Sequence, residues 1–400
     1  MDPLKVIKSI QSGFGDALGF IAVVVALGAM IGRFLEHSGG GRVLAEWLLG
    51  KFGKDNAVWA VLAAAFLVGL PIFFEVGFII LVPLVWNLAR ESKKSLLYYG
   101  LPMTAALTVT HAMVPPHPAP SAAASLLGAD LGRTILYGVM LSIPMAISGG
   151  IIYGRWISKR IFVSVPAMAA REVKTDTSGL RPPSVGLVIL ILLLPVIFIF
   201  AASIADMLKF SSRAAIGFVG HPFSALLLTT LLAMYVFGVR RGMSRDEMGK
   251  MATEALLPIG TLLAIMGGGG AFKQVIVDSG AGGYAGKLLA SSAISPLLVA
   301  YVVAAGMRIA QGSATVAIIT AAGIVSPLVK GIPGYQPEMI VLALCAGGTI
   351  LSHVNDAGFW IVNEYFGMTV PQTLRSWSAM KVITSIVGIT AILTVQAFLH

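Results

Sequence analysis

Long apolar segments recur from one end of this sequence to the other, separated by short polar stretches. A helix needs about 20 mostly apolar residues to cross the hydrocarbon core of a bilayer, which is roughly 30 Å thick. Several segments reach that length, and only 12% of the residues are charged, about half the share found in water-soluble domains. We therefore expect an all-α polytopic membrane protein surrounded by lipid bilayer. The apolar segments span residues 14–35, 57–88, 97–113, 119–128, 134–154, 185–205, 222–239, 252–272, 294–329, 338–366 and 377–398.

Net charge and cysteine content exclude several functions. The formal net charge is +10, and we interpret it mainly as a topology signal, because Lys and Arg collect in the cytoplasmic loops of membrane proteins. No basic stretch interleaves with aromatic residues on a polar domain, so nucleic acid is not an expected partner. The single cysteine, Cys345, rules out intramolecular disulfides and Cys-based metal sites. We expect neither a metal nor an organic cofactor. The oligomeric state stays open, a homo-oligomer included.

Three short motifs return at offsets of 241 to 244 residues. Three offsets in so narrow a band predict an internal duplication, which is common in transporters. We predict a first transmembrane repeat over 1–155, a cytoplasmic connecting loop over 156–183 and a second repeat over 184–400. The helices 185–205 and 222–239 have no counterpart ahead of residue 14, so the first repeat is expected to lack its two opening helices. The matching motifs are Ser38-Gly39 with Ser279-Gly280, Pro83-Leu84-Val85 with Pro327-Leu328-Val329, and Thr110-His111 with Ser352-His353.

Two apolar segments are too long for one simple crossing, and each is interrupted near its middle. As a single helix, 57–88 would extend about 48 Å, but Pro71 breaks it; the segment 294–329 is interrupted at 311–313. We predict two re-entrant hairpins, which make the two repeats inverted relative to each other. The loops of one side then carry 17 Lys and Arg residues against 8 on the other, and the richer side is predicted to be cytoplasmic. That side comprises 36–56, 89–96, 155–183, 240–250 and 367–376.

Polar side chains occur at every break, and broken helices persist in a membrane only where protein or a wet cavity satisfies the backbone. In the first break Glu75 is flanked by apolar residues, and a charged side chain at mid-membrane costs roughly 2.5–3.5 kcal/mol. Because burial disfavours its ionised form, Glu75 suits reversible protonation; a structural cap of the hairpin tip is the alternative. The second break is rich in proline and carries His111 and His117. These histidines are candidates for substrate or proton binding, since histidine titrates near physiological pH, or for a purely structural role.

The second half of the chain repeats this coincidence of breaks and polar groups. At the second hairpin tip, Arg308 could bind a carboxylate bidentately or neutralise Glu75 or Asp356. The neighbouring half-helix N-termini offer unpaired N–H groups to an anion. The four glycines at 267–270 favour close helix packing over a ligand site. The expected substrate-binding residues are His111, His117, Arg308, Gln311, Ser313, Thr315, Ser352, His353 and Asn355, and the expected proton carriers are Glu75, His111 and Asp356.

These motifs resemble the gluconate:proton symporter (gluconate permease) family, which also includes a D-serine transporter. The resemblance runs from about Lys5 to the C-terminus, and members of that family begin with further helices ahead of this point. It implies an inverted-repeat ion-transporter fold with two re-entrant hairpins and two broken helices. It also implies proton-driven import of gluconate or a related sugar acid across the bacterial inner membrane. The motifs are GLPIFFEVGFIILVPLV (69–85), THAMVPPHPAPSAAA (110–124), GGGGAFKQVIVDSG (267–280), RIAQGSATVA (308–317) and SHVNDAGFW (352–360).

Three other functions compete with proton symport of a sugar acid. The substrate could be another small carboxylate such as D-serine. The coupling ion could be sodium, because Asn355 and Asp356 with unwound carbonyl groups would make a sodium site. An intramembrane enzyme using His111, His117 and Glu75 is the remote alternative. Its weakness is that no Ser or Cys nucleophile motif is present, and that duplicated breaks serve transport rather than catalysis.

The predicted topology assigns the loop 155–183 to the cytoplasm and His400 to the periplasm. With re-entrant hairpins, the segments from 185–205 to 377–398 make an odd number of crossings, so these two points lie on opposite sides. Fusions to green fluorescent protein and alkaline phosphatase measure this. We expect fluorescence from the loop fusion and phosphatase activity from the C-terminal fusion. The same reporter active at both positions would contradict the predicted hairpins.

Overall fold

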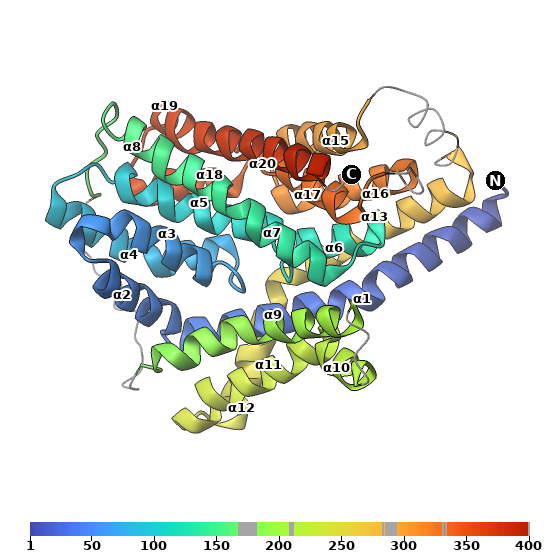
Figure 1. Ribbon diagram of the computed structural model, residues 1–400, viewed down its shortest axis with the longest axis horizontal. Helices are drawn as coiled ribbons and strands as arrows, with labels where there is room; N and C mark the ends of the chain where they lie inside the picture. Colours follow the sequence, from blue (N-terminus) through green and yellow to red (C-terminus); the bar gives the residue numbers. More distant parts are fainter. Residues whose placement is uncertain are drawn as a thin grey trace.

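The computed structural model is a bundle of helices in which segments from both halves of the chain intermingle (Figure 1). It describes residues 1–166, 182–207, 212–281, 284, 294–329, 332 and 334–398. Every regular element in those ranges is a helix, which confirms the expected all-α class. The middle of the predicted connecting loop, at 167–181, and His400 lie outside the described residues.

Helices of membrane-spanning length alternate with shorter apolar ones. In the described ranges, four helical stretches are long and apolar enough to cross a bilayer, and a fifth candidate is a bent pair whose two helices meet at 66°. The helices beside the predicted breaks are shorter than one crossing, so each depends on partners to satisfy its inner end. The four long stretches are Leu131–Ile157, Val185–Ala202, Pro222–Arg241 and Val370–Phe398, and the bent pair is Ala22–His37 with Gly40–Phe52.

The first half of the chain contains two pairs of helices separated by a break, as the sequence predicts. The first pair is α3 and α4, and the second is α5 and α6. In order, the elements are α1 (Pro3–His37), α2 (Gly40–Phe52), η1 (Lys54–Asn56), α3 (Ala57–Val68), α4 (Phe74–Ser92), α5 (Leu97–Met113), α6 (Pro118–Leu127), α7 (Leu131–Ala146), the π-helical turn η2 (Ile147–Ile152) and α8 (Tyr153–Ile157).

The second half repeats this order from α13 onward. The pair α15 and α16 matches α3 and α4, and the pair α17 and α18 matches α5 and α6; the repeat boundaries themselves stay predictions. The elements are α9 (Val185–Met207), α10 (Arg213–Gly220), α11 (Pro222–Phe237), η4 (Val239–Arg241), α12 (Arg245–Leu256), η5 (Leu257–Ile259), α13 (Gly260–Asp278), α15 (Pro296–Gln311), α16 (Ala314–Val329), α17 (Pro337–Gly348), α18 (Ala357–Phe366), α19 (Val370–Thr373), the π-helical turn η6 (Leu374–Ser378) and α20 (Ala379–Phe398).

Two stretches predicted as loops are helical instead. Residues 36–56 contain all of α2, whose Leu44 and Leu48 are buried. Residues four positions apart lie on the same face of a helix, so Leu44 and Leu48 form an apolar face. The prediction of a loop rested on the number of positive charges, which does not reveal this face. Residues 240–250 contain the start of α12, where Ser244 and Glu247 form a capping box that supplies the unpaired N–H groups of the first turn with acceptors.

The two halves of the chain interlock around the breaks. α1 and α13 pack against each other along much of their length (Figure 1). α4 of the first half packs on α18 of the second, where Trp86 donates to the carbonyl of Tyr365 at 3.1 Å. In the corresponding contact α16 packs on α6, and the Ser326 hydroxyl donates to the carbonyl of Leu126 at 2.7 Å. Each hairpin is therefore held by the broken helix of the opposite half.

The glycine run 267–270 of α13 serves close helix packing at Gly267 and Gly269, whereas a Cβ atom on Gly268 would meet no atom within 4 Å. A Cβ atom on Gly267 would lie 2.4 Å from the ring of Phe14 in α1, and one on Gly269 would lie 3.3 Å from Ile319 in α16. From the other side, a Cβ atom on Gly323 of α16 would lie 2.9 Å from the carbonyl oxygen of Gly269. Only a residue without a side chain allows helices to approach this closely, in agreement with the interpretation from sequence.

The tip of the second hairpin also depends on a glycine. Gly312 has a φ angle of +80°, in the left-handed region. A Cβ atom at this position would lie 2.2 Å from the backbone oxygen of Asn355 in the second broken helix. The hairpin tip and the unwound stretch at 349–356 therefore touch through their backbones.

We predict that Gly312→Ala destabilises the protein, whereas Gly306→Ala in the same helix does not. Alanine at residue 312 would have to adopt a left-handed conformation, at a cost of about 1–2 kcal/mol, and would also push the second break away. A Cβ atom on Gly306 meets no atom within 4 Å, and alanine is the better helix former. Thermal unfolding in detergent measures the stability of both variants. Equal melting temperatures would show that the contact of Gly312 with Asn355 does not stabilise the protein.

Candidate functional site

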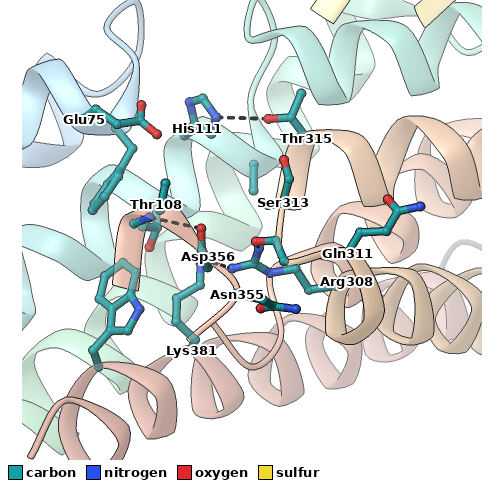
Figure 2. A pocket seen from close by; sticks show the side chains of 17 residues that line it. Glu75, Thr108, His111, Arg308, Gln311, Ser313, Thr315, Asn355, Asp356 and Lys381 are labelled. Carbon is teal, nitrogen blue, oxygen red and sulfur yellow. Dashed lines mark hydrogen bonds and ion pairs between the residues drawn. The ribbon is translucent and has the colours of Figure 1, made fainter. Parts of the chain in front are cut away.

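A cavity of about 300 Å³ lies where the two hairpin tips and the two helix breaks meet (Figure 2). Its volume is at the lower end of the range for small-molecule sites, about 300–1,000 Å³. All four polar breaks contribute to its wall, although they are separated by up to about 280 residues in the sequence. The sequence-predicted residues that line it are Glu75, His111, Arg308, Gln311, Ser313, Thr315, Asn355 and Asp356.

Arg308 ties the second hairpin tip to the second broken helix. Its side chain is only 2% exposed. Its Nε donates to the carbonyl of Ile350 at 3.3 Å, one terminal nitrogen donates to the carbonyl of Gly312, and the other donates to the carboxylate of Asp356. These charge-assisted bonds satisfy carbonyl groups that have no helical partner. Of the predicted pairings, Arg308 forms the one with Asp356 and not the one with Glu75.

Asp356 is held from three sides. Besides pairing with Arg308, its carboxylate caps α18 by accepting from the backbone N–H of Gly358 at 3.1 Å. It also accepts from the hydroxyl of Ser352, and the Ser352 oxygen in turn accepts from Nε1 of Trp377 at 2.6 Å. Ser352 therefore acts as a link between the break and the π-helical turn η6, and it does not line the cavity.

Two predicted residues of the same break share one acceptor. Nε2 of His353 lies 3.1 Å from the carbonyl oxygen of Ile309, and Nδ2 of Asn355 lies 3.0 Å from it. Both side chains thus fasten the break to the last turn of α15. Asn355 also lines the cavity, whereas His353 does not.

In the first half of the chain, a contact without an ion pair holds the hairpin tip against the broken helix. His117 is buried, and its Nε2 lies 2.6 Å from the carbonyl oxygen of Gly69 at the first hairpin tip. His117 lies behind the cavity, next to His111, with their ring centroids 4.7 Å apart. His111 lines the cavity, but His117 does not.

Glu75 lies in the first turn of α4 and directs its carboxylate into the cavity (Figure 2). It makes no salt bridge within the part of the chain that the structure describes. Glu75 and Asp356 thus differ although both line the same wall. Asp356 has a full set of partners, whereas the Glu75 carboxylate has no countercharge.

Two contacts join the halves of the chain across the cavity. The hydroxyl of Thr315, in the first turn of α16, lies 3.4 Å from Nε2 of His111 in α5. The rings of Phe74 and Trp377 lie 5.5 Å apart between centroids. Nδ1 of His111 is buried without a hydrogen-bond partner among the described residues, so this ring has spare hydrogen-bonding capacity.

Among the lining residues that the sequence interpretation missed, three have side chains that can form hydrogen bonds: Thr108, Trp377 and Lys381. Thr108 and Trp377 lie within continuous apolar segments and give no local signal. Lys381 is the one charged residue in the apolar segment 377–398. An isolated ionisable residue within a membrane span predicts a function, and that signal would have identified it.

The site is built to hold an anion. First-turn residues of α4, α16 and α18 line the cavity, and each helix N-terminus carries a partial positive charge of about 0.5 elementary charge. Hydroxyl and amide groups on the same walls can bind polar groups of a ligand. No cluster of three or more metal-ligating side chains occurs in the described ranges.

Solved structures share this fold at low sequence identity. The YdaH transporter of Alcanivorax borkumensis superposes with a TM-score of 0.71 at 13% identity, over 100% of this chain and 90% of that one. MtrF of Neisseria gonorrhoeae, from a class of antimetabolite efflux pumps, superposes with a TM-score of 0.69 at 15% identity, over 98% and 84% of the two chains. At such identities the likeness shows the fold alone.

Closer relatives are named as sugar-acid transporters. A gluconate permease of Pseudomonas aeruginosa is 44% identical over 99% of this chain and 88% of its own length. A high-affinity gluconate transporter of Escherichia coli K12 is 43% identical over 97% and 89%. The Gnt-II system L-idonate transporter of the same organism is 39% identical over 100% and 91%. The model of the GntP family permeases matches residues 1–399. The chain is thus a multi-pass membrane transporter that belongs to the GntP family of permeases.

Proposed function

We propose that this chain imports gluconate or a closely related sugar acid across the bacterial inner membrane by proton symport. The observation that carries the proposal is one cavity in which both halves of the chain bring together helix N-termini, hydroxyl groups, two cations and two carboxylates. A sugar acid has one carboxylate and several hydroxyl groups, and these match that set. The names of the relatives, gluconate permease and L-idonate transporter, support the same substrate class.

The substrate would bind between the second hairpin tip and the two breaks. Its hydroxyl groups would meet Gln311, Ser313 and Thr315 of the hairpin tip and Asn355 of the break that touches this tip. Ser313 has spare capacity, because within the described residues its hydroxyl makes one long contact, 3.4 Å from the backbone nitrogen of Val316. The N-termini of α16 and α18 would favour the anion.

Among the three candidate proton carriers, the contacts favour Glu75. Asp356 is paired with Arg308 and bonded to Ser352, so protonating it would break a buried ion pair. Glu75 has no salt bridge within the described ranges and can gain a proton without such a loss. His111, whose Nδ1 is unpartnered there, would pass or share the proton. The coupled ion is therefore the proton in this proposal.

Alternating access would come from movement of the hairpin tips relative to the breaks, with the site fixed between them. The proposed orientation has the connecting loop in the cytoplasm and the C-terminus in the periplasm. Substrate and proton would enter the cavity from the periplasm and leave toward the cytoplasm. A homo-oligomer is compatible with this mechanism but is not required by it.

Uptake by purified protein in proteoliposomes tests the proposal. Labelled gluconate should accumulate when the outside is more acidic than the inside, and a protonophore should abolish the accumulation. Replacing the pH gradient with a sodium gradient should give only equilibration. Accumulation driven by sodium would refute proton coupling. Unlabelled gluconate, idonate, 5-ketogluconate and D-serine as competitors rank the substrates, and stronger competition by D-serine than by all three sugar acids would refute the sugar-acid assignment.

We predict that Glu75→Gln abolishes proton-driven accumulation but keeps passive exchange. Glutamine fills the same space and keeps hydrogen-bonding capacity, but it cannot carry a proton. The measurement is labelled gluconate uptake under a pH gradient, compared with exchange of labelled against unlabelled gluconate without a gradient. Glu46→Gln serves as the matched control, because Glu46 is an exposed carboxylate on α2. Full concentrative uptake by Glu75→Gln would remove Glu75 from the mechanism.

We also predict that Ser313→Ala and Asn355→Ala each weaken substrate binding roughly 2- to 10-fold, the effect of losing one neutral hydrogen bond of about 0.5–1.5 kcal/mol. The measured quantity is the KM for gluconate uptake. Ser92→Ala is the control, since its hydroxyl bonds only to the carbonyl of Leu88 at the end of α4. An unchanged KM in both cavity variants would show that the second hairpin tip does not contact the substrate.

A further inference from the structure

Lys381 extends into the cavity from α20, a helix without a break at that position (Figure 2). The residue is 3% exposed. Within the described part of the chain its ammonium group makes no hydrogen bond and no ion pair. The ring of Trp377 lies 5.8 Å from its Nζ, at the limit of a cation–π contact. A buried ammonium group with so few partners is unfavourable until an anion joins it.

We propose that Lys381 recognises the carboxylate of the substrate and that Arg308 is a positioning residue. This inference rests on the proposed function, because it assigns one end of the transported sugar acid. Arg308 and Lys381 are the cations among the described residues that line the cavity. Their surroundings differ in a way that separates their roles.

The guanidinium group of Arg308 is already occupied. All three of its nitrogens donate to protein acceptors, and one of these acceptors is the carboxylate of Asp356. A substrate that took Arg308 would have to leave Asp356 buried without a countercharge, which is strongly unfavourable. Lys381 forms no hydrogen bond or ion pair within the described residues, and the nearby Asp356 that attracts it is already paired with Arg308, so an incoming carboxylate meets less competition there.

The charge balance of the cavity favours the same assignment. The pair of Arg308 and Asp356 is neutral as a unit, and Lys381 adds one positive charge when it is protonated. When Glu75 and Lys381 both carry a proton, the cavity has a net charge of +1 and attracts a monoanion. Once the anion has bound at Lys381, the occupied cavity is neutral, so the change of access from one side of the membrane to the other has a lower electrostatic cost. The lysine thus links the binding of the anion to the protonation of Glu75.

The position of Lys381 also orients the substrate. Lys381 lies at one end of the cavity, while Gln311, Ser313 and Thr315 form another wall (Figure 2). With its carboxylate at Lys381, a sugar acid would extend its hydroxyl groups toward the second hairpin tip. Lys381 would then decide the preference for an acid over the matching neutral polyol, and the tip would decide among sugar acids.

Chemical replacement of the charge on one folded protein tests this assignment. Lys381→Cys is purified and divided into two portions. One reacts with 2-aminoethyl methanethiosulfonate, which restores an ammonium group at about the length of lysine, and the other with methyl methanethiosulfonate, which adds no charge. Binding of labelled gluconate to the detergent-solubilised protein is measured for both, with unlabelled gluconate and sorbitol as competitors.

We expect the methylthio-modified protein (Cys–S–S–CH3) to bind gluconate roughly 10- to 100-fold more weakly than the wild type, the effect of losing a hydrogen bond to a charged group. The aminoethylthio-modified protein should recover most of that loss. Sorbitol, which has no carboxylate, should not compete with labelled gluconate for either modified protein. Equal binding by the two portions would overturn the assignment. The native Cys345 is fully buried, and wild type treated with both reagents controls for its reaction.

Two further controls separate the possible failures. Lys159→Cys places the cysteine at an exposed position. Its gluconate binding should be unchanged by either reagent. If Lys381→Cys does not fold, the pair Lys381→Arg and Lys381→Met replaces it in proteoliposome uptake, and equal uptake by these variants overturns the assignment. If the wild type binds no gluconate but binds idonate or D-serine, the sugar acid of the proposed function is wrong and Lys381 is tested with that carboxylate. If the wild type binds none of these acids, both proposals fail.

Discussion

The unwound stretch of the second broken helix depends on the ion pair between Arg308 and Asp356. Backbone carbonyl groups inside a membrane need donors, because no water is present in the hydrocarbon region to supply them. Arg308 meets this need for Gly312 and Ile350 while its charge is balanced by Asp356. One buried side chain thereby holds a hairpin tip against a break and keeps both at the wall of the cavity.

The corresponding contact in the first half of the chain is neutral, and this difference divides the roles of the halves. There His117 reaches the carbonyl of Gly69, and no ion pair is needed at the first hairpin tip. Among the described residues Glu75, next to that tip, has no salt bridge, whereas Asp356 is paired with Arg308. In the proposed mechanism the first half thus contributes the carboxylate that takes up a proton. The second half contributes the helix N-termini and hydroxyl groups that suit an anion.

The interlocked packing makes the two halves depend on each other. α4 rests on α18, and α16 rests on α6, so neither hairpin tip can move without its partner from the opposite half. The contact between His111 and Thr315 crosses the cavity at the same level. A change of charge at Glu75 and the arrival of an anion near α16 therefore act on one connected set of helices. Such a connected set is what ion-coupled transport requires.

The sequence by itself determined the helices, the breaks and most of the polar residues at the cavity, because apolar length, proline and glycine act locally. Glu75, His111 and Asn355 were found since each interrupts an apolar segment. The tertiary structure alone decided which groups meet. It paired Arg308 with Asp356, moved His117, Ser352 and His353 behind the cavity wall, and turned residues 36–56 into a helix. It also brought Lys381 to the cavity from an unbroken helix. These outcomes depend on contacts between segments far apart in the chain, and no local pattern encodes such contacts.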